Sequence, residues 1–239
     1  MENIIKKISA IIAGSVIYLL VSSFYLSLKG FVPDSDKFWV FKPAYAEEEN
    51  LSHKEIQPNF AFPQDHILGN ADAKVTIYEY SSFGCSHCAD LHVEVMPKII
   101  KEYVDTGLIK LGFVPLPLDK NSMDAALLAE CVQKDRYFEF ANTLFKKQRD
   151  WMLAFEPLKV MKQLVLLAGV NADKANVCLK DDTVAARILG DRKSAIDELG
   201  IVGTPSLIIS SPLGNEMISG GLTFDNLSGY IDEHLQSIQ

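Results

Sequence analysis

The fold is decided by residues 74–88, which read KVTIYEYSSFGCSHC. Most of the first seven residues are β-branched or aromatic, and this composition indicates a buried strand over 74–80. A short polar turn follows, and the pattern then predicts a helix over about 85–104. A strand that enters a helix through a short turn places Cys85 and Cys88 in the first turn of that helix.

The rest of the chain continues this alternation of strands and helices. A second apolar run predicts a strand over 108–115, and about seventy residues without a convincing strand pattern come after it. Two short strands near the end, 206–210 and 216–219, indicate a hairpin, and Thr223 is a good N-cap for a last helix. Helical patterns cover residues 125–132, 137–145, 158–168 and 182–199. This order predicts an α/β fold with a helical insertion.

Composition limits the classes of partner. The chain has 239 residues, 48% of them hydrophobic, which suits one domain with an insertion and a sizeable core. Residues 1–46 hold five of the 23 basic and three of the 31 acidic residues, so the remainder has 18 against 28, a net charge of −10. An acidic body argues against nucleic acid or anionic lipid as the main partner.

The N-terminus has the features of an export signal. Lys6 and Lys7 precede an uncharged run from Ile8 to Leu28, which as a helix would span a bilayer core with the lysines on the cytoplasmic side. Residues 44–46 read Ala-Tyr-Ala, a small-x-small cleavage pattern. Residues 1–46 are therefore either a cleaved signal peptide or a retained membrane anchor, with a buried soluble helix as a third interpretation. Both preferred interpretations place the body of the chain outside the cytoplasm.

The motif with the clearest chemistry is Cys85-Ser86-His87-Cys88. The free N–H groups and the dipole of a helix N-terminus favour an anion, so Cys85 is expected to hold a stabilised thiolate. A thiolate is the nucleophile of disulfide exchange, and Cys88 lies near enough to close or resolve a disulfide. His87 adds a donor that can stabilise the Cys85 thiolate, although the same dipole disfavours an imidazolium there.

Two other interpretations of this motif need no redox chemistry. Cys85 and Cys88 could form a static disulfide, or they could belong to a zinc cluster together with His92. A fourth ligand is not evident in the nearby sequence, and metal-binding cysteine pairs usually come twice. A redox centre at Cys85 and Cys88 that holds no metal and no cofactor is therefore preferred.

Glu79 is the second candidate. Val75, Ile77 and Glu79 alternate onto one face of the predicted strand. A carboxylate in an otherwise apolar strand is costly unless it is protonated or paired. Because it precedes Cys85 by six residues, Glu79 could pass a proton to Cys88 during exchange. The alternative is a glutamate at a strand edge in contact with water.

The third candidate is Gly203-Thr204-Pro205, which comes directly before the predicted strand at 206–210. Proline is rare within strands except at the first residue or on an edge. On base rates alone the bond before Pro205 would be trans, because only about 5–6% of X–Pro bonds in folded proteins are cis.

Together these stretches resemble the DsbA family of bacterial thiol–disulfide oxidoreductases. The resemblance is carried by the residues from Asp65 to Leu91, by the insertion and by the residues from Gly200 to Gly221, and it covers nearly the whole chain after residue 60. It implies a thioredoxin-like fold with a helical insertion. It also implies that Cys85 is the exposed nucleophile and that Cys88 is buried.

The resemblance gives expectations for the other candidates as well. Glu79 and His87 match the acidic residue and the histidine that tune the thiols of the family, and Pro205 matches a cis-proline beside the cysteines, which overrides the base rate. Ser86 stands where the best-known family centre has proline. Thr204 stands where the strongest oxidants commonly have valine, and threonine also occurs there in disulfide isomerases. Both departures bear on the redox potential.

Cys131 and Cys178 both lie in the insertion. Free buried thiols are one interpretation. A structural disulfide is preferred, because the expected compartment is oxidising and because some family members carry such a second pair. Closing this long loop would contribute on the order of 4 kcal/mol of stability in the chain-entropy model.

The composition and the order of the predicted elements set the expected domain limits. They are 1–46 for a signal peptide or anchor, 47–59 for a tether, 60–116 for the first part of the thioredoxin-like domain, 117–186 for the helical insertion and 187–239 for the second part of the domain.

The preferred function is that of an extracytoplasmic, for example periplasmic, oxidase that passes the Cys85–Cys88 disulfide to reduced exported proteins. A quinone-linked membrane oxidase would reoxidise it, and an uncleaved run from Ile8 to Leu28 would hold it at the membrane. The second hypothesis is a disulfide isomerase or reductase, but known isomerases of the superfamily use a separate dimerisation domain, and residues 47–60 are too few to form one. The third is a tethered metal-binding or structural module.

Overall fold

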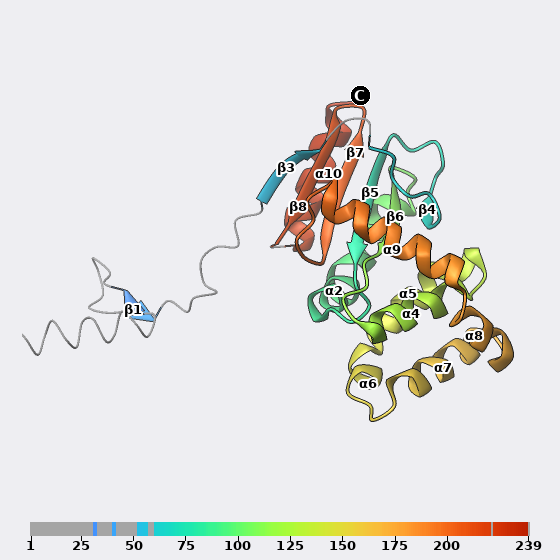
Figure 1. Cartoon of the computed structure of the whole chain (residues 1–239). Coiled ribbons are helices and arrows are strands. Elements are labelled where there is room, and N and C mark those ends of the chain that lie inside the picture. The colour runs from blue at the N-terminus through green and yellow to red at the C-terminus, as the bar shows by residue number, and fades with distance from the viewer. Residues whose placement is uncertain (1–30, 33–39, 42–51, 57–59, 221, 239) are drawn as a thin grey trace, which may run out of the picture. The chain divides into compact units, whose positions relative to one another are not determined.

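The computed structural model of the chain describes residues 31–32, 40–41, 52–56, 60–220 and 222–238 (Figure 1). The chain forms two compact units, Met1–Asn50 and Leu51–Gln239. In the first unit, strand β1 (Phe31–Val32) pairs antiparallel with strand β2 (Val40–Phe41).

The predicted export signal lies mainly beyond what the structure describes. The uncharged run from Ile8 to Leu28 and the cleavage pattern at 44–46 are outside the described residues. Among the helices that are described, none combines the length and the apolar character that crossing a bilayer requires.

The second unit is built on a six-stranded sheet with the strand order β3-β8-β7-β5-β6-β4. The central strand β5 runs parallel to β6 and antiparallel to β7, and every one of its residues is buried. The strands are β3 (Ser52–Ile56), β4 (Ile67–Gly69), β5 (Val75–Ser81), β6 (Ile109–Pro115), β7 (Ser206–Ser211) and β8 (Gly214–Ser219). The predicted strands at 74–80 and 108–115 and the predicted hairpin are confirmed within a residue or two.

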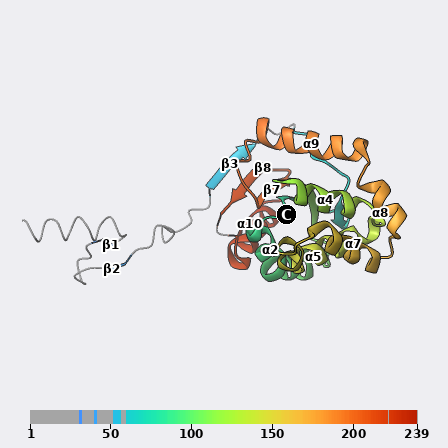
Figure 2. The same ribbon diagram turned by 60° about the horizontal axis from the view of Figure 1, so that its bottom comes forward.

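Helices cover both faces of the sheet (Figures 1 and 2). One face packs Ile77, Ile109 and Leu207 against the helix that follows β5 and against α10 (Phe224–Gln236). On the other face, Tyr80 and Ile208 pack against α9 (Asp182–Asp197). A central strand with both faces covered needs apolar residues at nearly every position, which is why β5 reads as a continuous buried run. Glu79, with no exposed surface, is the one charged residue of this strand.

The helix after β5 is continuous from residue 86 to 104 but alternates between α and π turns. It consists of α2 (Ser86–Asp90), a π segment η1 (Leu91–Val95), α3 (Met96–Ile99) and a second π segment η2 (Ile100–Val104). The first π segment ends just before Pro97, which has no N–H for the helical ladder, so the preceding turn widens. The predicted helix over 85–104 is thus confirmed, with this irregularity near the expected kink.

The insertion packs beyond one end of the sheet around its own apolar core (Figure 1). Trp151 and Leu144 are completely buried in it. Its helices are α4 (Lys120–Glu130), the 3-10 turn η3 (Lys134–Arg136), α5 (Tyr137–Lys146), α6 (Gln148–Met152), α7 (Pro157–Leu167) and α8 (Ala172–Cys178). The sequence did not predict α6 and α8, because helices of five and seven residues show too few turns to establish a period. The expected thioredoxin-like architecture with a helical insertion is confirmed.

Two expected limits need correction. Residues 47–59 were expected to be a tether, but Ser52–Ile56 forms the edge strand β3, paired antiparallel with β8. Backbone pairing holds an edge strand with little apolar pattern in its sequence, which is why it was missed. The expected limit between 186 and 187 falls inside α9, whose Ile188 packs in the insertion core while Ala195 packs on the sheet.

Candidate functional site

Cys85 and Cys88 lie where β5 passes into its helix. Cys85 is the N-cap of α2 and is partly exposed, whereas Cys88 has no exposed surface, and both are free thiols. The turn is tight because the Cys85 N–H donates to the Ser82 carbonyl, 3.0 Å away. Gly84 leaves room in this turn, because a Cβ at this position would lie 2.4 Å from the Ser122 hydroxyl oxygen, which would have to move.

The two thiols have opposite electrostatic environments. The pKa of Cys85 is lowered to about 5, chiefly because the Cys88 thiol donates a hydrogen bond to the Cys85 thiolate. The hydroxyl of Thr204 and the backbone N–H groups of Cys88 and His87 act in the same direction. Burial raises the pKa of Cys88 well above its ordinary value. Cys85 is therefore the thiolate at neutral pH, and Cys88 remains a thiol.

His87 contributes to this centre through its backbone. Its N–H is among the groups that lower the pKa of Cys85, while its side chain is exposed to solvent. From the sequence, the imidazole was expected to stabilise the Cys85 thiolate. Any residue other than proline supplies the same N–H, so residue identity at 87 carries less of the effect than expected.

The loop before β7 closes the site from the other side. The Thr204–Pro205 bond is cis, as the resemblance implied. The Cys85 sulfur lies 3.3 Å from the Thr204 carbonyl oxygen, to which it donates when it is protonated. The structure thus places residues 204–205 beside the cysteines, although more than a hundred residues of sequence separate them.

Glu79 is buried beneath the cysteines and is paired. The Ser81 hydroxyl donates to Glu79 Oε1, and His92 Nε2 lies 2.9 Å from the same oxygen. Ser81 in turn lies within hydrogen-bonding reach of Cys88. The alternative of a glutamate at a wet strand edge is excluded by its complete burial.

His92 has a different place from the one the sequence argument considered. It was weighed only as a zinc ligand with Cys85 and Cys88. In the structure its Nε2 faces Glu79, and its ring stacks on Phe145 with 4.1 Å between the centroids. Among the residues that the structure describes, no three His, Cys, Asp or Glu side chains are grouped so that they could hold a metal ion. The sequence signal for this position of His92 was its spacing of four residues from Cys88, because this spacing puts both side chains on one helix face.

Gln148 is a site residue that the sequence argument missed. Its side-chain N–H₂ group donates to the carbonyl oxygens of Phe83, at 2.7 Å, and Cys85, at 2.8 Å. It reaches them from the start of α6, so it ties the insertion to the turn that carries the cysteines. Nothing in the sequence indicated this contact, because the two segments meet only in the folded chain.

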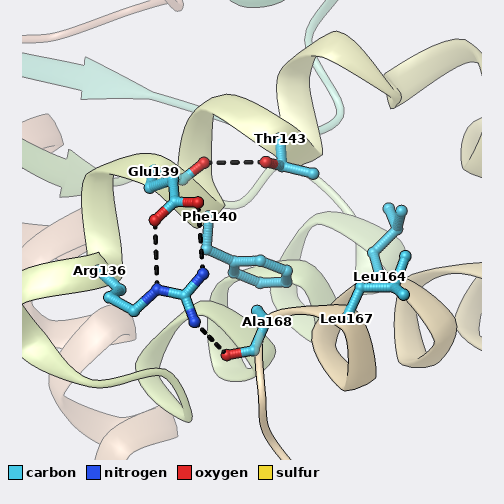
Figure 3. Close-up of a pocket in the computed structure, with 7 residues that line it drawn as sticks. All are labelled: Arg136, Glu139, Phe140, Thr143, Leu164, Leu167 and Ala168. Carbon is cyan, nitrogen blue, oxygen red and sulfur yellow. Dashed lines mark hydrogen bonds and ion pairs between the residues drawn. The ribbon is translucent and has the colours of Figure 1, made fainter.

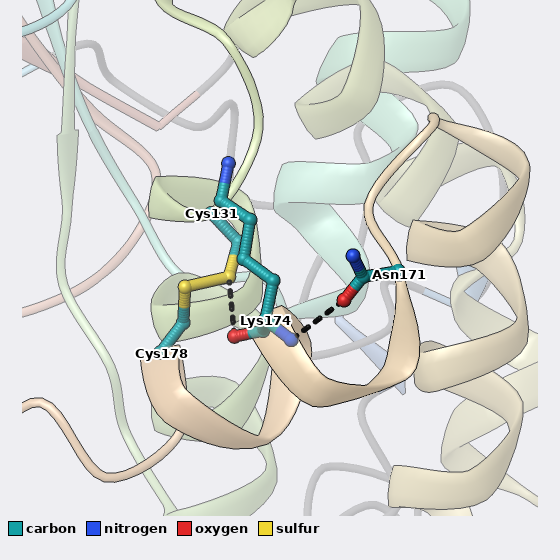
Figure 4. The surroundings of a disulfide bond; sticks show 4 residues. All are labelled: Cys131, Asn171, Lys174 and Cys178. Carbon is teal, nitrogen blue, oxygen red and sulfur yellow. Dashed lines mark hydrogen bonds between the residues drawn. A yellow bond between two sulfur atoms is a disulfide. The ribbon is translucent and has the colours of Figure 1, made fainter.

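The second cysteine pair lies in the insertion and is joined. A disulfide links Cys131, just after α4, with Cys178, the last residue of α8, with 5.9 Å between their Cα atoms (Figure 4). The carbonyl oxygen of Lys174 lies 3.5 Å from the Cys131 sulfur. Asn171 caps α8 by accepting from the Lys174 N–H, which fixes the helix that presents Cys178.

Among the described residues, a pair of hollows lies along the insertion. One, of about 340 Å³, lies between the helix after β5 and α5, and His92 is part of its wall. The other, of about 180 Å³, lies between α5 and α7 (Figure 3). There Arg136 pairs with Glu139 and donates to the Ala168 carbonyl, so the polar groups at its rim already bind one another. None of the residues around this second hollow belongs to the cysteine centre.

A nucleophilic cysteine beside a buried partner, on a sheet with a helical insertion, defines a class of protein: a thiol–disulfide exchange enzyme with a thioredoxin-like fold. The family model described as Thioredoxin matches residues 62–233. Disulfide bond formation protein D of Bacillus subtilis is 26% identical over 175 residues, which are 71% of this chain and 77% of that protein.

Solved structures agree. Alpha-DsbA1 of Wolbachia pipientis superposes with a TM-score of 0.68 at 27% identity, over 75% of this chain and 94% of that one. BdbD of Bacillus subtilis, in its oxidised form, has the same fold, with a TM-score of 0.66 at 24% identity over 76% of this chain and 97% of that one. The chain belongs to the thioredoxin family, as a DsbA-like thiol–disulfide oxidoreductase.

Proposed function

We propose that this enzyme works outside the cytoplasm as an oxidase, which passes the Cys85–Cys88 disulfide to reduced exported proteins. The observation that carries the proposal is the asymmetry of the two thiols. A pair becomes a stronger oxidant as its reduced form is stabilised, and Cys85 is stabilised as a thiolate by several donors at once. Disulfides persist outside the cytoplasm, so the Cys131–Cys178 bond fits that location.

The exchange proceeds in two steps. A client thiolate attacks the Cys85 sulfur, the Cys85–Cys88 bond breaks, and its electron pair passes to Cys88, which takes up a proton. A second client thiolate then attacks the client sulfur of the mixed disulfide and releases the Cys85 thiolate. The client loses two electrons and the enzyme gains them. Glu79 supplies the proton that Cys88 takes up, since Ser81 joins the two groups.

The enzyme then has to be reoxidised. A quinone-linked membrane oxidase would accept the two electrons, and a retained anchor over the run from Ile8 to Leu28 would bring the two proteins together. The departure at Ser86 moderates the oxidising power without reversing it, whereas the Thr204 hydroxyl lowers the pKa of Cys85 and so supports that power. On this proposal Cys85, Cys88 and Glu79 exchange electrons and the proton, and Thr204, Pro205 and His87 shape the surroundings of Cys85.

The test measures the direction of electron flow. The disulfide form is mixed with a reduced client that has a known disulfide, and the equilibrium potential of Cys85–Cys88 is measured against glutathione. We expect stoichiometric oxidation of the client and a potential well above the thioredoxin value of about −270 mV. If the enzyme leaves the reduced client unchanged but rearranges scrambled disulfides, the isomerase hypothesis replaces this one.

A further inference from the structure

We propose that the proton exchanged by Cys88 reaches solvent through a path formed by Ser81, Glu79 and His92, which ends in the cavity beside His92. The inference rests on thiol–disulfide exchange at Cys85 and Cys88 and extends it to the protons. It assigns to His92 a function in proton transfer in which it acts through Glu79.

The path follows from the match between a strand and a helix. Residues two apart on a strand lie on one face about 6.6 Å apart, and residues four apart on a helix lie on one face about 6 Å apart. Two neighbouring pairs can therefore form between β5 and the helix packed against it. Glu79 can face His92, and Ser81 can face Cys88. His92 Nε2 lies 2.9 Å from Glu79 Oε1, and a hydrogen bond from the Ser81 side chain acts to lower the pKa of Cys88.

The groups on this path are connected and shielded from water. The Ser81 hydroxyl and His92 Nε2 both contact Glu79 Oε1, so a single carboxylate oxygen connects the serine with the histidine. Hydroxyl, carboxyl and imidazole groups can each give and accept a proton or a hydrogen bond. Glu79 is fully buried and His92 is 6% exposed, so the imidazole shields the carboxyl group on the side of the cavity.

The outer end of the path is a built cavity. The hollow of about 340 Å³ has apolar walls from Met96, Ile100 and Phe138, which leave the imidazole of His92 as the ionisable group next to Glu79. The charged groups on its wall are Glu139 and Lys146, both on α5. His92 is thus the residue that belongs both to the buried path and to a space large enough for water molecules.

The path carries one proton in each direction per cycle. When the Cys85–Cys88 bond is reduced, the bond electrons pass to Cys88, and a proton moves from Glu79 through Ser81 to that sulfur while His92 replaces it from the cavity. When a disulfide reoxidises the enzyme, Cys85 first forms the mixed disulfide. Cys88 then loses its proton through the same groups, attacks Cys85 and expels the leaving thiolate.

The experiment follows the second of these reoxidation steps. Reduced enzyme is mixed with glutathione disulfide, and acid quenching at intervals separates formation of the mixed disulfide at Cys85 from its resolution by Cys88. We expect His92→Phe, which keeps an aromatic ring against Phe145, to slow the resolution step roughly tenfold, since a positioned proton-transfer group contributes about 10²–10⁴-fold and water entering the cavity replaces part of it. The first step, which uses only Cys85, should keep its wild-type rate.

The chain offers a matched control. His66 is equally buried, its Nε2 lies 2.7 Å from Glu130 Oε1, and its ring stacks on Tyr137. His66→Phe removes the same kind of pair and should keep both steps at wild-type rates. Chemical rescue completes the test: millimolar imidazole should restore the resolution step of His92→Ala and leave that of His66→Ala unchanged. The pH profile of this step should differ from that of wild type in His92→Phe and match it in His66→Phe.

These outcomes separate the path from the proposed oxidase function. A folded His92→Phe whose resolution step and pH profile equal those of wild type overturns the path and leaves the oxidase function standing. Equal slowing in His92→Phe and His66→Phe also overturns it, because the effect would then be one of lost packing. A wild-type enzyme that resolves its glutathione adduct but cannot oxidise clients removes the oxidase function and leaves the path.

Discussion

The two cysteine pairs of this chain lie at opposite ends of their helices. Cys85 is the N-cap of α2, where backbone N–H groups point toward its sulfur. Cys131 is the C-cap of α4 and Cys178 is the last residue of α8, so both lie at helix C-termini, where the last backbone carbonyl groups have no partner within the helix. A helix dipole favours an anion at the N-terminus and disfavours one at the C-terminus.

This difference separates a reactive pair from a structural pair. A stabilised thiolate favours the reduced form, so the proposed oxidase function requires that Cys85–Cys88 gives up its disulfide readily. At a helix C-terminus the thiolate is disfavoured, so Cys131–Cys178 keeps its disulfide. The sequence separations act in the same direction, because a bond between residues 47 apart closes a long loop of the unfolded chain and a bond between Cys85 and Cys88 closes almost none.

The largest expected effect comes from removing one sulfur of each pair. Cys85→Ser should abolish client oxidation, because no other described thiol is free and exposed to attack. The matched change in the other pair is the double variant Cys131→Ser/Cys178→Ser, which leaves no unpaired thiol behind. It should keep the rate of thiol exchange within about twofold. The assay is oxidation of a reduced client under identical conditions. Loss of exchange in the double variant with its fold intact would contradict the division of roles.

The second expected effect is on stability. Removing the Cys131–Cys178 bond in Cys131→Ala/Cys178→Ala should lower the free energy of unfolding by about 4 kcal/mol, the chain-entropy value for a loop of this length. Denaturant unfolding of both proteins, with Cys85 and Cys88 reduced, gives the difference. Reduction of Cys85–Cys88 in the same background should raise stability instead, since that pair is more stable reduced. A shift in the same direction for both pairs would remove the contrast.

The third expected effect is a dependence on pH that only the reactive pair has. Folding lowers the pKa of Cys85 from about 9 to about 5. A group with a depressed folded pKa stabilises the fold fully above its unfolded pKa, and this contribution disappears as the pH falls through the folded pKa. The Tm of the reduced enzyme should therefore rise relative to that of the oxidised enzyme between pH 5 and about pH 8. Above this window the slope reverses, because folding raises the pKa of Cys88 and the unfolded chain then loses that proton more readily than the folded one. A constant difference in Tm over this window would show that the Cys85 pKa is ordinary.

The secondary structure nearest the reactive pair could be predicted from the sequence because it is formed by consecutive residues. The strand β5, its turn and the first turn of its helix are adjacent in sequence, so their patterns and the positions of Cys85 and Cys88 could be predicted directly. Glu79 could be singled out for the same reason, as one charge in an apolar strand. The fold class followed from the order of such elements.

The rest of the site depends on contacts between segments that are distant in the sequence. Gln148 reaches the Cys85 carbonyl across 63 residues, and the apolar pattern of the insertion gave no sign of it. The contact between His92 and Glu79 forms only when the helix packs on the strand, so the sequence alone did not predict this pair. Backbone groups also escaped prediction, since the N–H of residue 87 acts on Cys85 whatever the side chain is.

The smallest expected effect separates the side chains around Cys85 from its backbone donors. Thr204→Val removes a hydroxyl that lowers the pKa of Cys85, so this pKa should rise and the potential should become more reducing, by roughly 30 mV at most, which corresponds to one pKa unit in a two-electron couple. His87→Ala keeps the backbone N–H that contacts Cys85, so its shift should be smaller than that of Thr204→Val. Alkylation rates against pH give the Cys85 pKa, and glutathione equilibrium gives the potential. If His87→Ala shifts both quantities more than Thr204→Val does, the imidazole stabilises the thiolate directly, and the helix N-terminus explains less of the difference between the two cysteine pairs.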